Sequence, residues 1–71
     1  MVFGQNLRRF RKDRNLTQTQ LGEMVGVWFS AISNIERGES EPSLELAGKL
    51  ADALGVTVDD FRKEQPEQVQ A

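Results

Sequence analysis

Apolar residues recur every three or four positions along most of the chain, which is the period of an amphipathic helix. Near the start, Leu7 and Phe10 form such a stripe, with Phe3 one turn earlier. This stripe predicts a first helix that ends before Asn15, a residue type that tolerates the left-handed backbone of helix ends. No alternating strand pattern competes, so the chain is predicted to be all-α.

Residues 18–38 contain two short helical segments with a tight turn between them. Thr17 can cap the first segment, and Gln20 stands three positions later, where a capping box has Gln or Glu. Gly22 lacks the side chain that would hold off a crossing helix. Gly26 is expected to end this segment, because a Cβ would clash in the left-handed conformation needed there.

The two segments also divide into an inward and an outward face. The inward positions are Leu21, Val25, Ile32 and Ile35. Outward positions at helical spacing in the second segment are Ser30, Ser33, Asn34 and Arg37. Gly38 is expected to end that helix. Two crossed helices with a polar outer stripe are typical of a helix-turn-helix that binds DNA.

Two more helices follow. Pro42 and Ser43 are expected to open a fourth helix that Gly55 ends. Its apolar face is Leu44, Ala47, Leu50, Ala51 and Leu54. Thr57 and Asp60 form a weaker capping pair for a short last helix containing Val58 and Phe61. The pattern predicts one domain over residues 1–63, and a disordered, Gln-rich tail over residues 64–71.

From about Phe3 to Phe61 the sequence resembles the phage-repressor and Cro-like helix-turn-helix proteins, or XRE family. The residues that carry the resemblance are LRRFRKDRNLTQTQLGEMVGV and AISNIERGESEPSLELAGKLADALGVTVDDF. The resemblance implies a five-helix, lambda-repressor-like DNA-binding domain. It also implies a transcriptional regulator, in the simplest case a repressor, whose third helix enters the major groove of double-stranded DNA.

Composition fits this interpretation with one difficulty. The 71 residues are 38% hydrophobic and 28% charged, as in an ordinary small globular domain, but the net charge is −2. Residues 1–40 carry six Lys or Arg against four acids, and residues 41–71 carry three against seven. The excess of acidic residues therefore lies in the second part of the sequence, away from the predicted motif. Few phosphate-directed cations predict weak non-specific binding and reliance on base and shape readout.

Several function classes are disfavoured. The chain has neither Cys nor His, so it offers no disulfide, no thiolate or imidazole metal site and no His-based acid–base chemistry. Asp59 and Asp60 are adjacent rather than facing, and no nucleophile–base set or Gly-rich phosphate loop is visible. We therefore expect no enzyme activity and no cofactor. No signal peptide or membrane span is recognisable, so a cytoplasmic protein without membrane contact is expected.

The outward stripe supplies the candidate base contacts. Asn pairs bidentately with adenine and Ser meets either base edge, so Ser30, Ser33 and Asn34 are assigned to bases rather than to a merely polar surface. Gln18 in the first turn of its helix is assigned to phosphate, as the resemblance implies, with a solvated surface Gln as the alternative. Arg37 suits a phosphate, although it would also satisfy the helix dipole alone.

Trp28 and Phe29 depart from the family, which usually has Ser or Thr at position 28 to cap the recognition helix. Losing that cap is expected to lower the stability of the start of the recognition helix by about 1 kcal/mol. Phe29 is assigned to thymine methyl groups, and Trp28 to the sugar–phosphate backbone. Two alternatives stay open for Trp28: packing back on the second helix or the Phe3 region, and forming a protein-binding hot spot with Phe29.

The resemblance also implies a structural ion pair between Arg11 and Glu36, and both can reach the interface between the first and third helices. A homodimer is expected, and the guessed interface is the short last helix together with the end of the fourth helix, including Val58 and Phe61. The rival interpretation is a helix-turn-helix that binds protein, as an antitoxin, anti-repressor or co-activator. The net negative charge of the chain and the adjacent aromatic residues Trp28 and Phe29 favour this rival.

Overall fold

A computed structural model describes residues 2–63 of the chain. In chain order the helices are α1 (Val2–Asp13), α2 (Gln18–Val25), α3 (Phe29–Glu36), α4 (Leu44–Leu54) and α5 (Val58–Arg62). The predicted all-α fold of five helices is confirmed, and residues 2–63 contain no strand. The tail predicted for residues 64–71 lies outside the described residues.

The helix ends are set by local chemistry that the sequence displays. Thr17 Oγ1 accepts from the Gln20 N–H at 3.0 Å, and the Thr17 N–H donates to Gln20 Oε1 at 2.8 Å. Both halves of the capping box are therefore present at the start of α2. Asn15 after α1 and Gly26 after α2 have φ of 57° and 82°, in the left-handed region that turns the chain out of each helix.

A second capping box begins α5. Thr57 Oγ1 accepts from the Asp60 N–H at 3.2 Å, while the Thr57 N–H donates to Asp60 Oδ2 at 2.9 Å. This backbone hydrogen bond from Thr57 lowers the pKa of Asp60 below its ordinary value. The lowered pKa means that the box is favoured while Asp60 is ionised, and it weakens only as the pH falls through that pKa.

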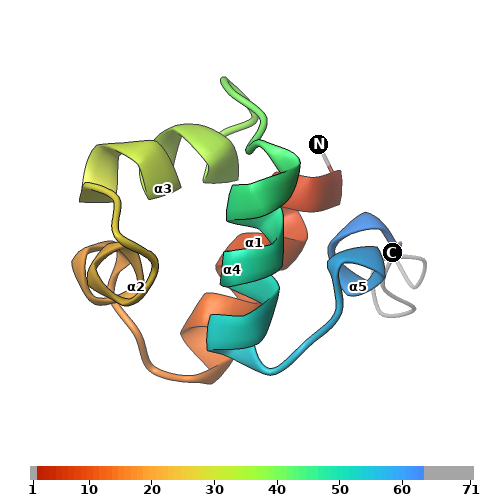
Figure 1. Cartoon of the computed structure of the whole chain (residues 1–71), viewed down its shortest axis with the longest axis horizontal. Coiled ribbons are helices and arrows are strands. Elements are labelled where there is room, and N and C mark those ends of the chain that lie inside the picture. Colours follow the sequence, from red (N-terminus) through yellow and green to blue (C-terminus); the bar gives the residue numbers. More distant parts are fainter. Residues whose placement is uncertain (1, 64–71) are drawn as a thin grey trace, which may run out of the picture.

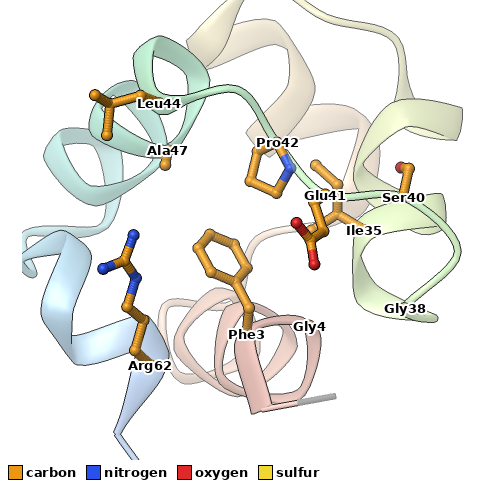
Figure 2. Close-up of a pocket in the computed structure, with 10 residues that line it drawn as sticks. All are labelled: Phe3, Gly4, Ile35, Gly38, Ser40, Glu41, Pro42, Leu44, Ala47 and Arg62. Carbon is orange, nitrogen blue, oxygen red and sulfur yellow. The ribbon is translucent and has the colours of Figure 1, made fainter.

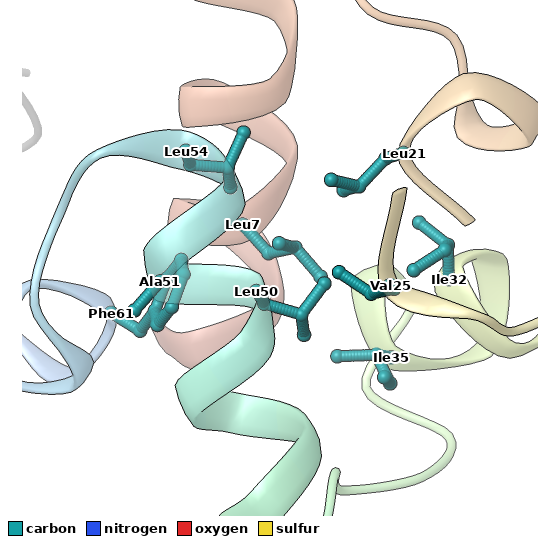
Figure 3. Close-up of a cluster of buried hydrophobic side chains, with 9 residues drawn as sticks. All are labelled: Leu7, Leu21, Val25, Ile32, Ile35, Leu50, Ala51, Leu54 and Phe61. Carbon is teal, nitrogen blue, oxygen red and sulfur yellow. The ribbon is translucent and has the colours of Figure 1, made fainter. Parts of the chain in front are cut away.

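The core is one apolar cluster to which every helix contributes (Figure 3). Its members are Leu7, Leu21, Val25, Ile32, Ile35, Leu50, Ala51, Leu54 and Phe61. The Phe61 ring packs against Phe3 and Phe10, with ring centroids 4.8 Å and 5.8 Å apart. Each predicted apolar stripe therefore delivers residues to the same core, except that Leu44 stays exposed.

Burial of Phe61 corrects the dimer surface guessed from the sequence. The side chain of Phe61 is 0% exposed, and Val58 is half-buried against the same core. At the end of α4, Leu54 and Ala51 are buried as well. Phe61 therefore holds α5 onto the domain and has no surface to offer a second copy.

The helices are arranged so that α2 and α3 form one side of the molecule and α5 the other, with α1 and α4 between them (Figure 1). In this view α2 is seen end-on while α3 runs across the picture, so the two helices cross steeply. α1 packs against both α3 and α5, and α2 packs against both α3 and α4. α3, the second helix of the motif, is thus held in place by packing against α1 as well as against α2.

Two residues of α1 make these contacts possible. Gly4 lies against α3 so closely that a Cβ on it would stand 2.7 Å from the Glu36 carbonyl oxygen. Asn6 is fully buried, and its Nδ2 donates to the carbonyls of Phe61 and Lys63, both at 2.7 Å. Asn6 therefore caps the last helix, whose terminal carbonyls would otherwise lack partners.

Candidate nucleic-acid interface

The turn between α2 and α3 sets the angle of the pair. The Val27 N–H donates to the Gly22 carbonyl at 2.9 Å, and a Cβ on Gly22 would stand 2.5 Å from the Val27 carbonyl oxygen. The close approach predicted at Gly22 is therefore present, but its partner is the backbone of the turn rather than a crossing helix. Any side chain at position 22 would push the turn, and α3 with it, out of place.

The polar stripe of α3 is directed away from the core. Ser30 is exposed, Ser33 and Asn34 are half-buried, and Arg37 directly after the helix is exposed. On the opposite face, Ile32 and Ile35 are buried. The structure thus brings the four polar residues onto one outward face that the core residues hold in a fixed orientation.

Arg37 connects this face into one hydrogen-bonded group, which the sequence did not predict. Its Nη1 donates to Ser33 Oγ at 2.9 Å and its Nη2 donates to Asn34 Oδ1 at 2.6 Å. A third partner is Glu39, whose carboxylate lies 3.2 Å from Nη2. The guanidinium therefore occupies one lone pair of Asn34 Oδ1, and the second lone pair and the amide N–H groups of Asn34 remain to face a ligand.

Arg11 and Glu36 form an ion pair that joins α1 to α3. The Arg11 Nε lies 2.6 Å from Glu36 Oε2, and the side chains are only 9% and 4% exposed. Arg11 also donates to the Leu16 carbonyl at 2.7 Å. The pair thus fixes the end of α3 and the loop before α2 together.

Gln18 is the third member of this network. Its Nε2 donates to Glu36 Oε1 at 3.1 Å, so the side chain is held rather than freely solvated. A primary amide has a second N–H on the same nitrogen, and the first N–H groups of α2 have no partner within the helix. The start of α2 therefore presents oriented donors that suit a phosphate oxygen.

Trp28 occupies the N-cap position of α3 without capping it. Its backbone is extended, as a cap requires, but its side chain makes no hydrogen bond to the helix. The side chain is also 82% exposed, so the alternative that Trp28 folds back onto the core is wrong. An indole has a donor but no acceptor for a backbone N–H, and this position therefore favours another role over helix stability.

We expect Trp28→Ser to raise the free energy of unfolding by about 1 kcal/mol, because serine supplies the missing cap acceptor. For a domain of this size the melting temperature should rise by roughly 4–8 °C. Thermal unfolding followed by circular dichroism measures the change. Trp28→Ala is the matched control, since it removes the indole without adding an acceptor, and an equal rise in both variants would contradict the explanation.

Apolar side chains extend the outward surface beside the polar stripe. Phe29 in the first turn of α3 is 55% exposed, and Met24 on α2 is 54% exposed. The place of Phe29 on this surface was predicted from the sequence, whereas that of Met24 was not, because its exposure depends on how α2 is rotated. With Trp28 they give the motif an apolar leading edge, which suits contact with thymine methyl groups or with another protein.

The chemistry of the surface is that of recognition. Over residues 2–63 no three side chains of the metal-ligating types gather into a cluster, and no helix has the length and apolar content to cross a bilayer. What the motif presents instead is a combination of hydroxyl, amide, guanidinium and aromatic groups on one face. These are the groups that recognise base edges and bind phosphates in protein–DNA complexes.

Comparison with known proteins shows which family has a similar sequence and a similar geometry. A helix-turn-helix family model matches residues 7–61. The immunity repressor protein of Bacillus phage phi105 is 41% identical over 58 residues, which cover 82% of this chain and 40% of that protein. The uncharacterized HTH-type transcriptional regulator MJ0272 of Methanocaldococcus jannaschii is 43% identical over 55 residues, covering 78% of this chain and 83% of the relative.

Among solved structures, the P22 c2 repressor protein in complex with synthetic operator 9T superposes with a TM-score of 0.83 at 39% identity. The match covers 86% of this chain and 92% of the repressor chain. The chain thus spans less than half of the phi105 repressor but nearly all of this operator-bound domain.

Proposed function

The chain belongs to the helix-turn-helix family of phage-repressor type, and from this premise we propose that it is a transcriptional regulator that binds double-stranded DNA in a sequence-specific manner. The observation that carries the proposal is the face of α3, on which Ser30, Ser33 and Asn34 point outward while buried isoleucines fix the helix from behind. A short helix held this way fits the major groove of B-DNA.

Base recognition is assigned to four residues of α3. Ser30, Ser33 and Asn34 supply hydrogen-bonding groups, and Phe29 supplies an apolar contact for thymine methyl groups. The exposure of the Phe29 ring at the leading end of the helix supports its role. The half-buried amide of Asn34 is held by Arg37, which reduces the entropy lost when it meets a base.

Contacts with the sugar–phosphate backbone are assigned to Gln18, Trp28 and Arg37. Gln18 is oriented by Glu36, and Trp28 lies beside the groove-facing helix with most of its surface free. Arg37 is exposed directly after α3, and its exposed ion pair with Glu39 is weak enough to be exchanged for a contact with a phosphate.

We expect a shallow salt dependence of DNA binding, because the interface has few cations. Each phosphate that the protein neutralises contributes about −0.9 to the slope of the logarithm of the binding constant against the logarithm of the salt concentration. Fluorescence anisotropy with a labelled duplex at several salt concentrations measures the slope. A value that requires about ten or more phosphate contacts would contradict reliance on base and shape readout.

The regulator is further proposed to act as a homodimer on a pseudopalindromic operator and to repress by blocking access to a promoter. Two-fold symmetry then places the half-sites about one DNA turn, roughly 34–36 Å, apart on one face of the duplex. A small domain with one reading helix supports this, since a second copy doubles the number of base contacts.

Selection of bound sequences from random duplexes tests the function. We expect an enriched sequence with two related half-sites at one-turn spacing, and Trp28 fluorescence that changes when the selected duplex is added. No enrichment, together with co-purification of a stoichiometric protein, would instead favour the rival in which the exposed Trp28 and Phe29 bind a protein partner.

A further inference from the structure

The side-chain amide of Asn34 can face a base in two orientations, which differ by half a turn of the amide group. In one orientation the oxygen lies where the nitrogen lies in the other, so an acceptor and a donor change places. A base pair presents its donors and acceptors to the major groove in a fixed order. The orientation of the Asn34 amide therefore decides which base it can pair with.

Arg37 selects one of these orientations. Its Nη2 donates to Asn34 Oδ1 at 2.6 Å. A guanidinium donates hydrogen bonds and accepts none, so a rotated amide would turn its own N–H groups toward the N–H groups of Arg37. Facing donors repel each other and leave both without a partner. The amide oxygen is thus kept on the side of Arg37, and the amide nitrogen lies on the other side.

The guanidinium of Arg37 is itself held at two further points. Nη1 donates to Ser33 Oγ at 2.9 Å, and Nη2 donates to Glu39 Oε1 at 3.2 Å. Together with Asn34 Oδ1 these acceptors fix the plane of the guanidinium, which a single bond would leave free to rotate. Ser33 accepts through its oxygen in this arrangement, so its own O–H remains to donate to a base.

The position of Glu39 follows from the way α3 ends. Gly38 has a left-handed φ of 78°, and its N–H donates to the Ile35 carbonyl at 3.0 Å. The Glu39 N–H donates to the Asn34 carbonyl at 2.9 Å. These two bonds form a Schellman motif. Glu39 is therefore fixed by its backbone beside the same turn that carries Asn34.

The neighbours of Glu39 in the loop face another way. Gly38, Ser40 and Glu41 line the pocket in which the Phe3 ring lies (Figure 2). Glu39 does not line this pocket, and its carboxylate contacts the exposed Arg37 instead. The contact between Glu39 and Arg37 therefore belongs to the outward face of α3 and not to the pocket.

We propose that Arg37 is a specificity-determining residue that acts through Asn34: it fixes the amide in one orientation and so restricts recognition to one base at the position that Asn34 contacts. The inference rests on the proposed function and adds to it the orientation of one base contact. A phosphate contact of Arg37 is compatible with it. Nη2 carries two hydrogens, so the one that faces Glu39 can pass to a phosphate while the other stays on Asn34.

Sequence selection with Arg37→Gln tests the fixed orientation. Glutamine offers both a donor and an acceptor, so it can pair with either orientation of the Asn34 amide. At the position that Asn34→Ala also relaxes, we expect the preference for the best base over the second base to fall by about fivefold or more, the lower end of what a bidentate contact discriminates. The positions contacted by Phe29 and Ser30 should keep their preferences.

Three further variants show whether the effect comes from donor chemistry and passes through Asn34. Arg37→Lys should retain more of the preference than Arg37→Gln, because an ammonium also donates without accepting. Lys12→Gln removes one cation from an exposed position in α1 and should leave the preference unchanged. Adding Arg37→Gln to Asn34→Ala should relax that position no further. Circular dichroism should show every variant folded, because the ion pair that Arg37→Gln removes is exposed.

The orientation of the amide can also be tested without DNA. ¹⁵N relaxation of the Asn34 side-chain amide should show a more ordered group in the parent than in Arg37→Gln, and equal order in the two proteins would overturn the inference. The inference is also wrong if Arg37→Gln weakens binding to all duplexes alike and leaves the selected sequence unchanged, since Arg37 would then contact phosphate only. If the parent selects no sequence, the proposed function fails, and the relaxation result still decides whether Arg37 fixes the amide.

Discussion

Replacing Glu36 by alanine is expected to lower the free energy of unfolding by about 3–5 kcal/mol, which is the range for removing one partner of a buried ion pair. The reason is the position of Arg11, which is 9% exposed and loses both of its hydrogen bonds to the carboxylate. Gln18 loses its acceptor in the same step. A domain of this size has little stability to spare, so the variant should melt many degrees below the parent.

Thermal or urea unfolding followed by circular dichroism measures the loss. Glu39→Ala is a matched control, since the Arg37–Glu39 pair is 56% and 61% exposed and an exposed pair contributes about 0–1 kcal/mol. Glu36→Gln keeps the volume and should fall between the parent and the alanine variant. A melting temperature of Glu36→Ala within a degree or two of the parent would show that the pair does not hold the fold together.

Helix positions and their ends could be predicted because they depend on neighbours in the sequence. The capping boxes join Thr17 with Gln20 and Thr57 with Asp60, three positions apart in each case, and the left-handed Gly26 and Gly55 follow directly on α2 and α4. The apolar period then fixed which face of each helix is buried. These features require no knowledge of how the helices pack.

Contacts between distant parts of the chain could not be predicted in the same way. The amide of Asn6 bonds to carbonyls about 55 residues further along, and nothing near Asn6 in the sequence indicates this. The closeness of Gly4 to the end of α3 likewise appears only when the two helices are crossed. The Arg11–Glu36 pair was expected from the family resemblance alone, since its two residues lie 25 positions apart.

The dimer surface was misjudged at Phe61 for a physical reason. A five-residue helix with two apolar residues leaves open whether they face the domain or a partner, and the Phe3 and Phe10 rings that cover Phe61 belong to α1. Conversely, Leu44 fits the apolar period of α4 but lies in its first turn, beyond the reach of the core. Periodicity identifies the stripe, whereas packing decides which of its members are buried.

Asn34→Ala is expected to weaken binding to the selected operator by about 1–3 kcal/mol, roughly fivefold to 150-fold, which is the range for a good bidentate base contact. In the parent the Asn34 side chain is held in place by the 2.6 Å bond from Arg37 to its Oδ1. The alanine variant keeps the phosphate-directed groups, so its binding to unrelated duplexes should be unchanged. Its loss is therefore one of specificity.

Repeating the sequence selection with Asn34→Ala gives the sharpest measurement. We expect the preference to relax at one base-pair position in each half-site while the other positions keep theirs, because the remaining contacts come from Phe29, Ser30 and Ser33. Gln5→Ala, which removes an exposed amide from α1, is the control and should select the parent sequence. An unchanged selection with Asn34→Ala would mean that this side chain reads no base, and α3 would then contribute shape and backbone contacts through its other residues.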